Sequence, residues 1–81
     1  MDNVYIGDIE LVPFNFAPNK WSKCEGQLIQ INQHPTLYSL LGSRYGGDGV
    51  TTFALPNLKD ASPIPGMHYC ISMEGLYPPR N

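Results

Sequence analysis

Two cysteines and two histidines are the side chains of this sequence best suited to catalysis or metal binding. They lie at Cys24, His34, His68 and Cys70. A cysteine nucleophile needs a neighbouring base, and no local motif pairs either cysteine with a histidine. The sequence also lacks the Gly-x-Ser-x-Gly elbow of hydrolases and the His-Glu-x-x-His motif of zinc proteases. We therefore expect no catalytic residues and no enzymatic activity.

The spacing of the two cysteines does not match a structural zinc site, in which two cysteines usually lie a few residues apart. Both have apolar neighbours, such as Trp21 near Cys24 and Ile71 beside Cys70. Buried free thiols are the simpler interpretation, because free cysteine is among the most buried residue types. The alternative is one disulfide between Cys24 and Cys70, which would close a long loop and add stability. We expect no metal and no cofactor.

A loop with three glycines and an aspartate is the most distinctive local feature, and it reads Gly46-Gly47-Asp48-Gly49. Calcium needs about six to eight oxygen ligands, more than one aspartate supplies. A phosphate-binding loop would continue with Gly-Lys and then Ser or Thr, which is absent here. The pattern instead predicts a rigid turn in which Asp48 accepts hydrogen bonds from its own backbone. Gly42 is predicted to end the preceding helix.

Aromatic side chains offer a second kind of site, because tyrosine and tryptophan rings can stack on sugars. In small domains they more often fill the core or a subunit interface. The candidates for interface or glycan contacts are Trp21, Tyr38, Tyr45, Tyr69 and Tyr77. Both interpretations stay open from the sequence.

Short elements must position these residues. Alternating apolar residues predict one or two strands in Tyr5–Phe14, and extended segments over Trp21–Cys24 and Gln27–Asn32. Proline at a first helical position predicts a helix over Pro35–Leu41. Its cap is expected from Asn32, Gln33 or His34, and its apolar face carries Leu37, Leu40 and Leu41. Such a short helix needs packing, which we expect against Trp21 and the Phe53–Leu55 run.

The C-terminal region is predicted to be irregular up to Gly66, because Pro63 and Pro65 interrupt regular structure. Met67–Met73 is then predicted as a strand, with Met67, Tyr69, Ile71 and Met73 on one face and His68, Cys70, Ser72 and Glu74 on the other. We expect Tyr5–Leu11 or Met67–Met73 to be an edge strand with unpaired backbone groups.

Composition limits the function further. The chain has 81 residues, enough for one domain, and only 15% of them are charged, against about 25% in typical proteins. A surface with few charges favours association with another copy. Five scattered basic residues and an acidic pI argue against nucleic acid as a partner. The sequence has no apolar run of membrane-spanning length and no signal-like N-terminus, so we expect synthesis in the cytoplasm.

Several segments resemble the phage tail collar domain family. They are residues 16–28, residues 29–42 and, most specifically, Tyr45-Gly46-Gly47-Asp48-Gly49 followed by Thr51-Thr52-Phe53-Ala54-Leu55-Pro56-Asn57-Leu58. The similarity covers about residues 5–65. Residues 67–81 are similar to the end of the microcystin-dependent-protein relatives in that family. We treat the chain as a single tail-collar-like domain over 1–81.

The resemblance implies an α+β fold of short strands with one short helix and a C-terminal strand returning to the sheet. It implies a structural, self-assembling module with no catalytic residues to carry over. We expect a homo-oligomer, as a trimer or fibre, with other tail or fibre proteins as further partners. Its place would be the virion tail or an extracellular appendage. A receptor- or glycan-binding tip protein and a subunit of a bacterial surface filament are the alternatives.

The sequence departs from the family where longer relatives insert a large, often histidine-bearing segment. Here Pro65-Gly66 leads directly to Met67, so the receptor-binding head and its metal-holding histidines have no counterpart. Val50 stands where a basic residue is common, and Lys59-Asp60 replaces the usual Arg-Gly. We therefore expect no charge-based contact between subunits at these positions.

Overall fold

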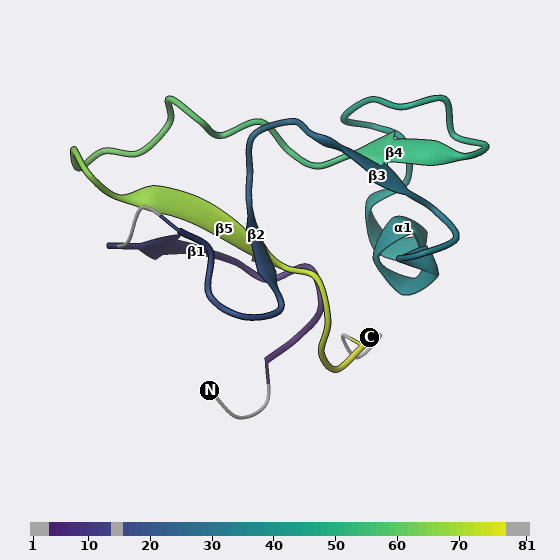
Figure 1. Ribbon diagram of the computed structural model, residues 1–81, viewed down its shortest axis with the longest axis horizontal. Helices are drawn as coiled ribbons and strands as arrows, with labels where there is room; N and C mark the ends of the chain where they lie inside the picture. The colour runs from purple at the N-terminus through teal and green to yellow at the C-terminus, as the bar shows by residue number, and fades with distance from the viewer. Residues whose placement is uncertain (1–3, 14–15, 78–81) are drawn as a thin grey trace.

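Five short strands and one helix make up the regular structure in the computed structural model, which describes residues 4–13 and 16–77. Figure 1 shows a three-stranded sheet at one end of the molecule, and a two-stranded sheet with the helix at the other. In chain order the elements are β1 (Ile9–Val12), β2 (Trp21–Lys23), β3 (Leu28–Gln30), α1 (Pro35–Leu41), β4 (Thr52–Ala54) and β5 (His68–Ser72). The predicted α+β fold is confirmed.

The larger sheet has the strand order β1-β5-β2, with both pairings antiparallel. Ile71 therefore lies between Ile9 on one side and Ser22 on the other. The expectation that Met67–Met73 forms an edge was wrong, because β5 is the central strand. Cys70, Ile71, Ser72 and Met73 are all buried, so both faces of the strand are covered near its C-terminal end. A central strand of a small domain is covered on both faces.

The smaller sheet pairs β3 with β4 and lies beside α1 (Figure 1). The helix begins at Pro35 as predicted, and Gly42 ends it by donating its N–H to the Tyr38 carbonyl at 2.7 Å. The predicted side-chain cap is absent, because His34 occupies the N-cap position and its side chain makes no capping hydrogen bond. Among the described residues, no helix has the length and apolarity to cross a membrane.

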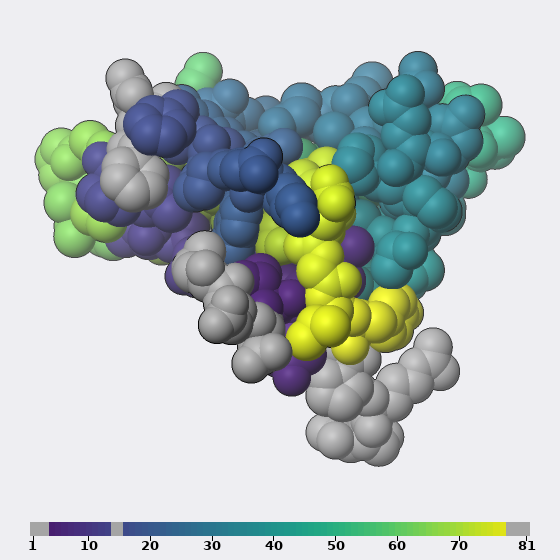
Figure 2. Space-filling view, turned by 60° about the horizontal axis from the view of Figure 1, so that its bottom comes forward, coloured from purple at the N-terminus to yellow at the C-terminus, as the bar shows by residue number. Residues whose placement is uncertain are grey.

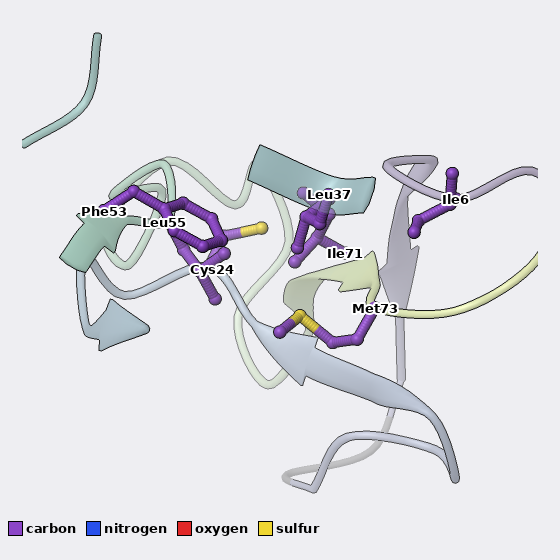
Figure 3. Packing of buried hydrophobic residues seen from close by; sticks show 7 residues of the cluster. All are labelled: Ile6, Cys24, Leu37, Phe53, Leu55, Ile71 and Met73. Atoms are coloured by element: carbon purple, nitrogen blue, oxygen red, sulfur yellow. The ribbon is translucent and has the colours of Figure 1, made fainter. Parts of the chain in front are cut away.

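One hydrophobic cluster joins the helix to both sheets (Figure 3). It consists of Ile6, Cys24, Leu37, Phe53, Leu55, Ile71 and Met73. Leu37 is fully buried, which stabilises the fold by about 1.5–3 kcal/mol relative to an exposed leucine. The ring of Tyr38 lies 5.4 Å from that of Phe53. The helix therefore packs against the Phe53–Leu55 run as expected, whereas Trp21 is outside the cluster.

The two ends of the described chain lie together. Tyr5 and Leu76 form a parallel bridge, and Ile6 donates its N–H to the Leu76 carbonyl at 2.8 Å. Figure 2 shows the C-terminal segment in yellow against the start of the chain in purple. The last described residues therefore pair with the backbone around Ile6, a residue of the core.

Candidate functional site

The glycine loop covers one edge of the smaller sheet. Along β4, the backbone groups of Thr52 and Ala54 point away from β3. Ala54 donates its N–H to the Gly46 carbonyl at 3.1 Å, and the Thr52 carbonyl accepts the Gly49 N–H at 3.0 Å. The loop therefore occupies the positions that another strand would need.

Asp48 holds this loop in shape. Its carboxylate accepts the backbone N–H groups of Val50, Thr51 and Thr52 at 2.7–2.9 Å, and also the Thr51 hydroxyl at 2.7 Å. These bonds, above all the one from Thr52, keep the pKa of Asp48 well below its usual range. The carboxylate is fully used by its own loop, which is the role predicted for a turn aspartate.

Glycine is required where the loop touches β4. A Cβ on Gly47 would lie 2.5 Å from the Phe53 Cα and 2.6 Å from the Thr52 carbonyl oxygen. One on Gly46 would lie 3.0 Å from the Ala54 Cβ. Gly47 also has a φ of 88°, in the left-handed region that side chains disfavour. The close backbone approach explains the glycines without a bound ligand.

The outer edge of β2 is also partly covered. Trp21 donates its N–H to the Pro18 carbonyl at 2.9 Å, and the Lys23 carbonyl accepts both the Gln27 side-chain amide at 2.8 Å and the Glu25 N–H at 3.2 Å. Two of the four outward backbone groups of this short strand are therefore satisfied within the chain. An added strand could bind only the other two groups, the Trp21 carbonyl and the Lys23 N–H.

The outer edges of β1 and β3 remain open. In β1, the ladder to β5 turns the N–H and C=O of Ile9 and Leu11 outward. In β3, the N–H and C=O of Leu28 and the N–H of Gln30 point outward, while the Gln30 carbonyl accepts the Gln33 N–H. Within the described chain, no hydrogen bond connects these outward groups of β1 and β3 to another residue.

Apolar side chains accompany the open edges. Ile9 is 39% exposed and Leu28 is 63% exposed, and Leu11 is half-buried. Each of these three residues also has outward backbone N–H and C=O groups that are unpaired within the described chain. Open backbone and exposed apolar side chains together are typical of a surface that pairs with another chain.

The predicted aromatic candidates do not form one surface. Tyr38 and Tyr69 pack against the core, and the Tyr38 hydroxyl donates to the Gly49 carbonyl at 3.2 Å. Tyr45 and Tyr77 are exposed, and the Tyr77 hydroxyl lies 3.3 Å from the Ser39 hydroxyl. Trp21 lines a hollow of about 540 Å³, which its neighbours complete: Val4, Pro18, Asn19, Lys20, Glu74, Gly75 and Leu76.

Both cysteines are free and buried in this structure. Cys24 continues the β2–β5 ladder opposite Tyr69, to whose carbonyl it donates its N–H at 3.0 Å, while Cys70 pairs with Lys23. Side chains alternate along strands, so the two thiols lie on opposite faces of the sheet. A disulfide between them would require rearrangement of the ladder. Burial raises the pKa of Cys24 to about 11 and also raises that of Cys70.

Neither histidine meets the cysteines in a metal-binding group. His34 precedes the helix, and His68 begins β5. In the described segments, no cluster of three or more His, Cys, Asp and Glu side chains is placed to hold a metal ion.

The sequence analysis offered Tyr5–Leu11 as one of two possible edge strands, and β1 is an edge of the larger sheet. It did not predict which edges of β2, β3 and β4 are open or covered, because that depends on strand order. The sequence pattern around Asp48 predicts a rigid turn, but it does not predict that the loop lies along β4. The strand order β1-β5-β2 joins segments from both ends of the chain, and no short motif encodes it.

Comparison with known proteins adds the family. The phage tail collar domain family matches residues 7–63, which include β1 to β4, the helix and the glycine loop. No curated protein and no solved structure matches the chain. The match covers most of the sequence and agrees with the motifs around the glycine loop, so the chain belongs to the phage tail collar domain family.

Proposed function

We propose that this protein is a structural subunit of a phage tail or tail fibre, and that it works by assembling with copies of itself. The observation that carries this proposal is that some strand edges are covered by the chain itself and others are open. The chain closes β4 with a dedicated loop and partly closes β2, but leaves β1 and β3 open. An exposed edge is a template for pairing with another chain unless it is blocked.

The composition supports self-association. Only 15% of the residues are charged, and the exposed apolar side chains include Ile9 and Leu28. Interface cores are depleted in charge, so such a surface loses little on burial. A chain of this size buries a small core of its own, and contacts with other copies would add to its stability.

The test is the oligomeric state of the purified protein. Light scattering over a range of concentrations should give a mass of at least three copies, and negative-stain microscopy should show rings or fibres. A monomer at every concentration would contradict self-assembly. Addition of other tail proteins from the same phage would then show whether the oligomer also binds heterologous partners.

A second function is favoured by one observation, the hollow beside Trp21. Trp21 lines this hollow together with the polar residues Asn19, Lys20 and Glu74. An aromatic surface for stacking beside polar groups is the combination found in sugar-binding sites. Because Trp21 is the only tryptophan, its fluorescence reports directly on this hollow. Titration with surface oligosaccharides should shift the emission if the hollow binds glycans. No shift and no heat by calorimetry would exclude this second function.

A further inference from the structure

The open edges of β1 and β3 differ in charge, and this difference disfavours the pairing of β1 with β1 of another copy. β1 carries Glu10 at its centre and follows Asp8, whereas β3 consists of Leu28, Ile29 and Gln30 and has no charged residue. Asp8 and Glu10 are two residues apart in an extended segment, so their side chains lie on the same side of it. A hydrogen bond with the Asp8 side chain raises the pKa of Glu10.

Pairing of β1 with β1 of a second copy is disfavoured. The outward groups belong to Ile9 and Leu11, so the antiparallel pair that uses all of them places Ile9 opposite Leu11 and Glu10 opposite Glu10. Like charges directly opposite each other destabilise a strand pair. Asp8 would add a further negative charge at each end.

Pairing of β3 with β3 is also the poorer arrangement. It would place Leu28 opposite Gln30, and one of the two carbonyl groups involved is already bonded to Gln33. It would also leave both β1 edges, with Ile9 and Leu11, exposed to water. Each copy has one open β1 edge and one open β3 edge. Only mixed pairing, in which β1 of one copy pairs with β3 of another, uses both edges.

We infer that β1 of one copy adds antiparallel to β3 of the next copy, with Leu11 opposite Leu28 and Ile9 opposite Gln30. This inference rests on the proposed self-assembly and specifies its contact. The exposed side chains of Ile9 and Leu28 and the half-buried side chain of Leu11 then lie on one face of the joined sheet. Three backbone hydrogen bonds form, from Leu11 to Leu28, from Leu28 to Leu11, and from Gln30 to Ile9.

The contact joins two different surfaces, so it repeats from copy to copy. Such a heterologous contact gives a ring if the rotation closes and a filament if it does not. The loop that covers β4 acquires a use in this arrangement. By blocking the second edge of the smaller sheet, it leaves β3 as the only strand of that sheet able to accept a partner.

Cysteine cross-linking tests the contact. Leu11→Cys and Leu28→Cys proteins are mixed and oxidised, and the cross-linked species are identified by mass spectrometry. Opposed residues in an antiparallel pair have Cα atoms about 5.5 Å apart, within the range for a disulfide. The mixture should yield a dimer with one copy of each variant, at least about tenfold more abundant than in either variant alone, since the two sites are opposed only in mixed pairing.

Matched controls separate the outcomes. Ile9→Cys mixed with Leu28→Cys should cross-link poorly, because these positions are diagonal neighbours about 7–8 Å apart. The wild type reports any background from the two buried native thiols. Efficient self-cross-linking of Glu10→Cys would show β1–β1 pairing and overturn the inference.

A second measurement does not depend on cross-linking. Leu28→Lys should weaken assembly by about tenfold or more, the loss expected for one buried leucine at a contact. Val50→Lys is the control, since Val50 is 80% exposed and lies outside both edges. If the wild type assembles but neither the cross-link nor the Leu28→Lys effect is found, the β1–β3 contact is wrong while self-assembly stands. If the wild type is monomeric, the proposed function fails as well.

Discussion

At the scale of single residues, Gly47 offers the sharpest test of the loop that covers β4. Gly47→Ala should destabilise the fold by more than about 3 kcal/mol, because the left-handed φ costs about 1–2 kcal/mol and the Cβ would collide with the backbone of Phe53. Gly66→Ala is a matched control: its φ is 85°, but no atom lies within 4 Å of the added Cβ. Chemical denaturation should show a loss of only about 1–2 kcal/mol for Gly66→Ala. Equal losses would mean that the close approach of Gly47 to β4 is unimportant.

Asp48 gives a prediction that depends on pH. Its pKa is lowered in the folded protein, so the stability it contributes is present above the pKa of the unfolded chain, about 4, and is lost as the pH falls towards the folded value. Asp48→Ala should therefore lower the melting temperature at pH 7 and differ less from the wild type near pH 2. Asp48→Asn keeps one acceptor oxygen for the backbone N–H groups and should lie between the two. A difference from the wild type that is unchanged at low pH would contradict this role of the carboxylate.

These two residues show what a sequence can and cannot reveal. The hydrogen bonds of Asp48 reach only residues two to four positions ahead, so the turn could be predicted from the local pattern. The contact of Gly47 with Phe53 depends on how the loop folds back on a strand. Three nearby glycines indicated a costly backbone, but not which atoms come close to it.

At the scale of elements, local signals predicted the helix better than the sheet. Pro35, the leucine spacing and Gly42 all lie within or next to the helix, and they gave bounds that match Pro35–Leu41. The strand at His68–Ser72 was also predicted, but its position between β1 and β2 was not. Strand order depends on contacts between residues some fifty positions apart, such as Ile71 and Ser22, and sequence periodicity carries no information on them.

The turn that leads into β2 carries backbone strain that can be removed. Trp21 donates to the Pro18 carbonyl, and Lys20, at the third position of the turn, has a φ of 69°. Glycine is the residue that a turn with positive φ at this position favours. Lys20→Gly should therefore stabilise the fold by about 0.5–1 kcal/mol in urea denaturation, after the greater flexibility of unfolded glycine is counted. Asn19→Gly is the control and should destabilise, because Asn19 has no positive φ. Loss of stability in Lys20→Gly would show that the lysine side chain contributes more than its strain costs.

At the scale of the whole molecule, the core is small, and the strand edges of β1 and β3 stay open. Seven buried side chains form the cluster that joins the helix to both sheets. Ile9 and Leu11 lie on the same face of the larger sheet as Ile71 and Tyr69, yet the helix does not cover them. The fold of one copy therefore leaves part of its own apolar face exposed, and the proposed contact would cover it with a neighbouring copy.

Linkage between folding and assembly gives the last prediction. If the folded chain binds its own copies and the unfolded chain does not, the melting temperature must rise with protein concentration. Over a hundredfold range the wild type should gain roughly 10–20 °C, since the mass-action term is about 2.7 kcal/mol for one contact per copy and a domain of this size shifts by about 4–8 °C per kcal/mol. Leu28→Lys should lose this dependence, whereas Val50→Lys should keep it. A wild-type melting temperature independent of concentration would mean that the exposed edges of β1 and β3 do not bind another copy, because no contact between copies can form without contributing to the stability of the folded chain.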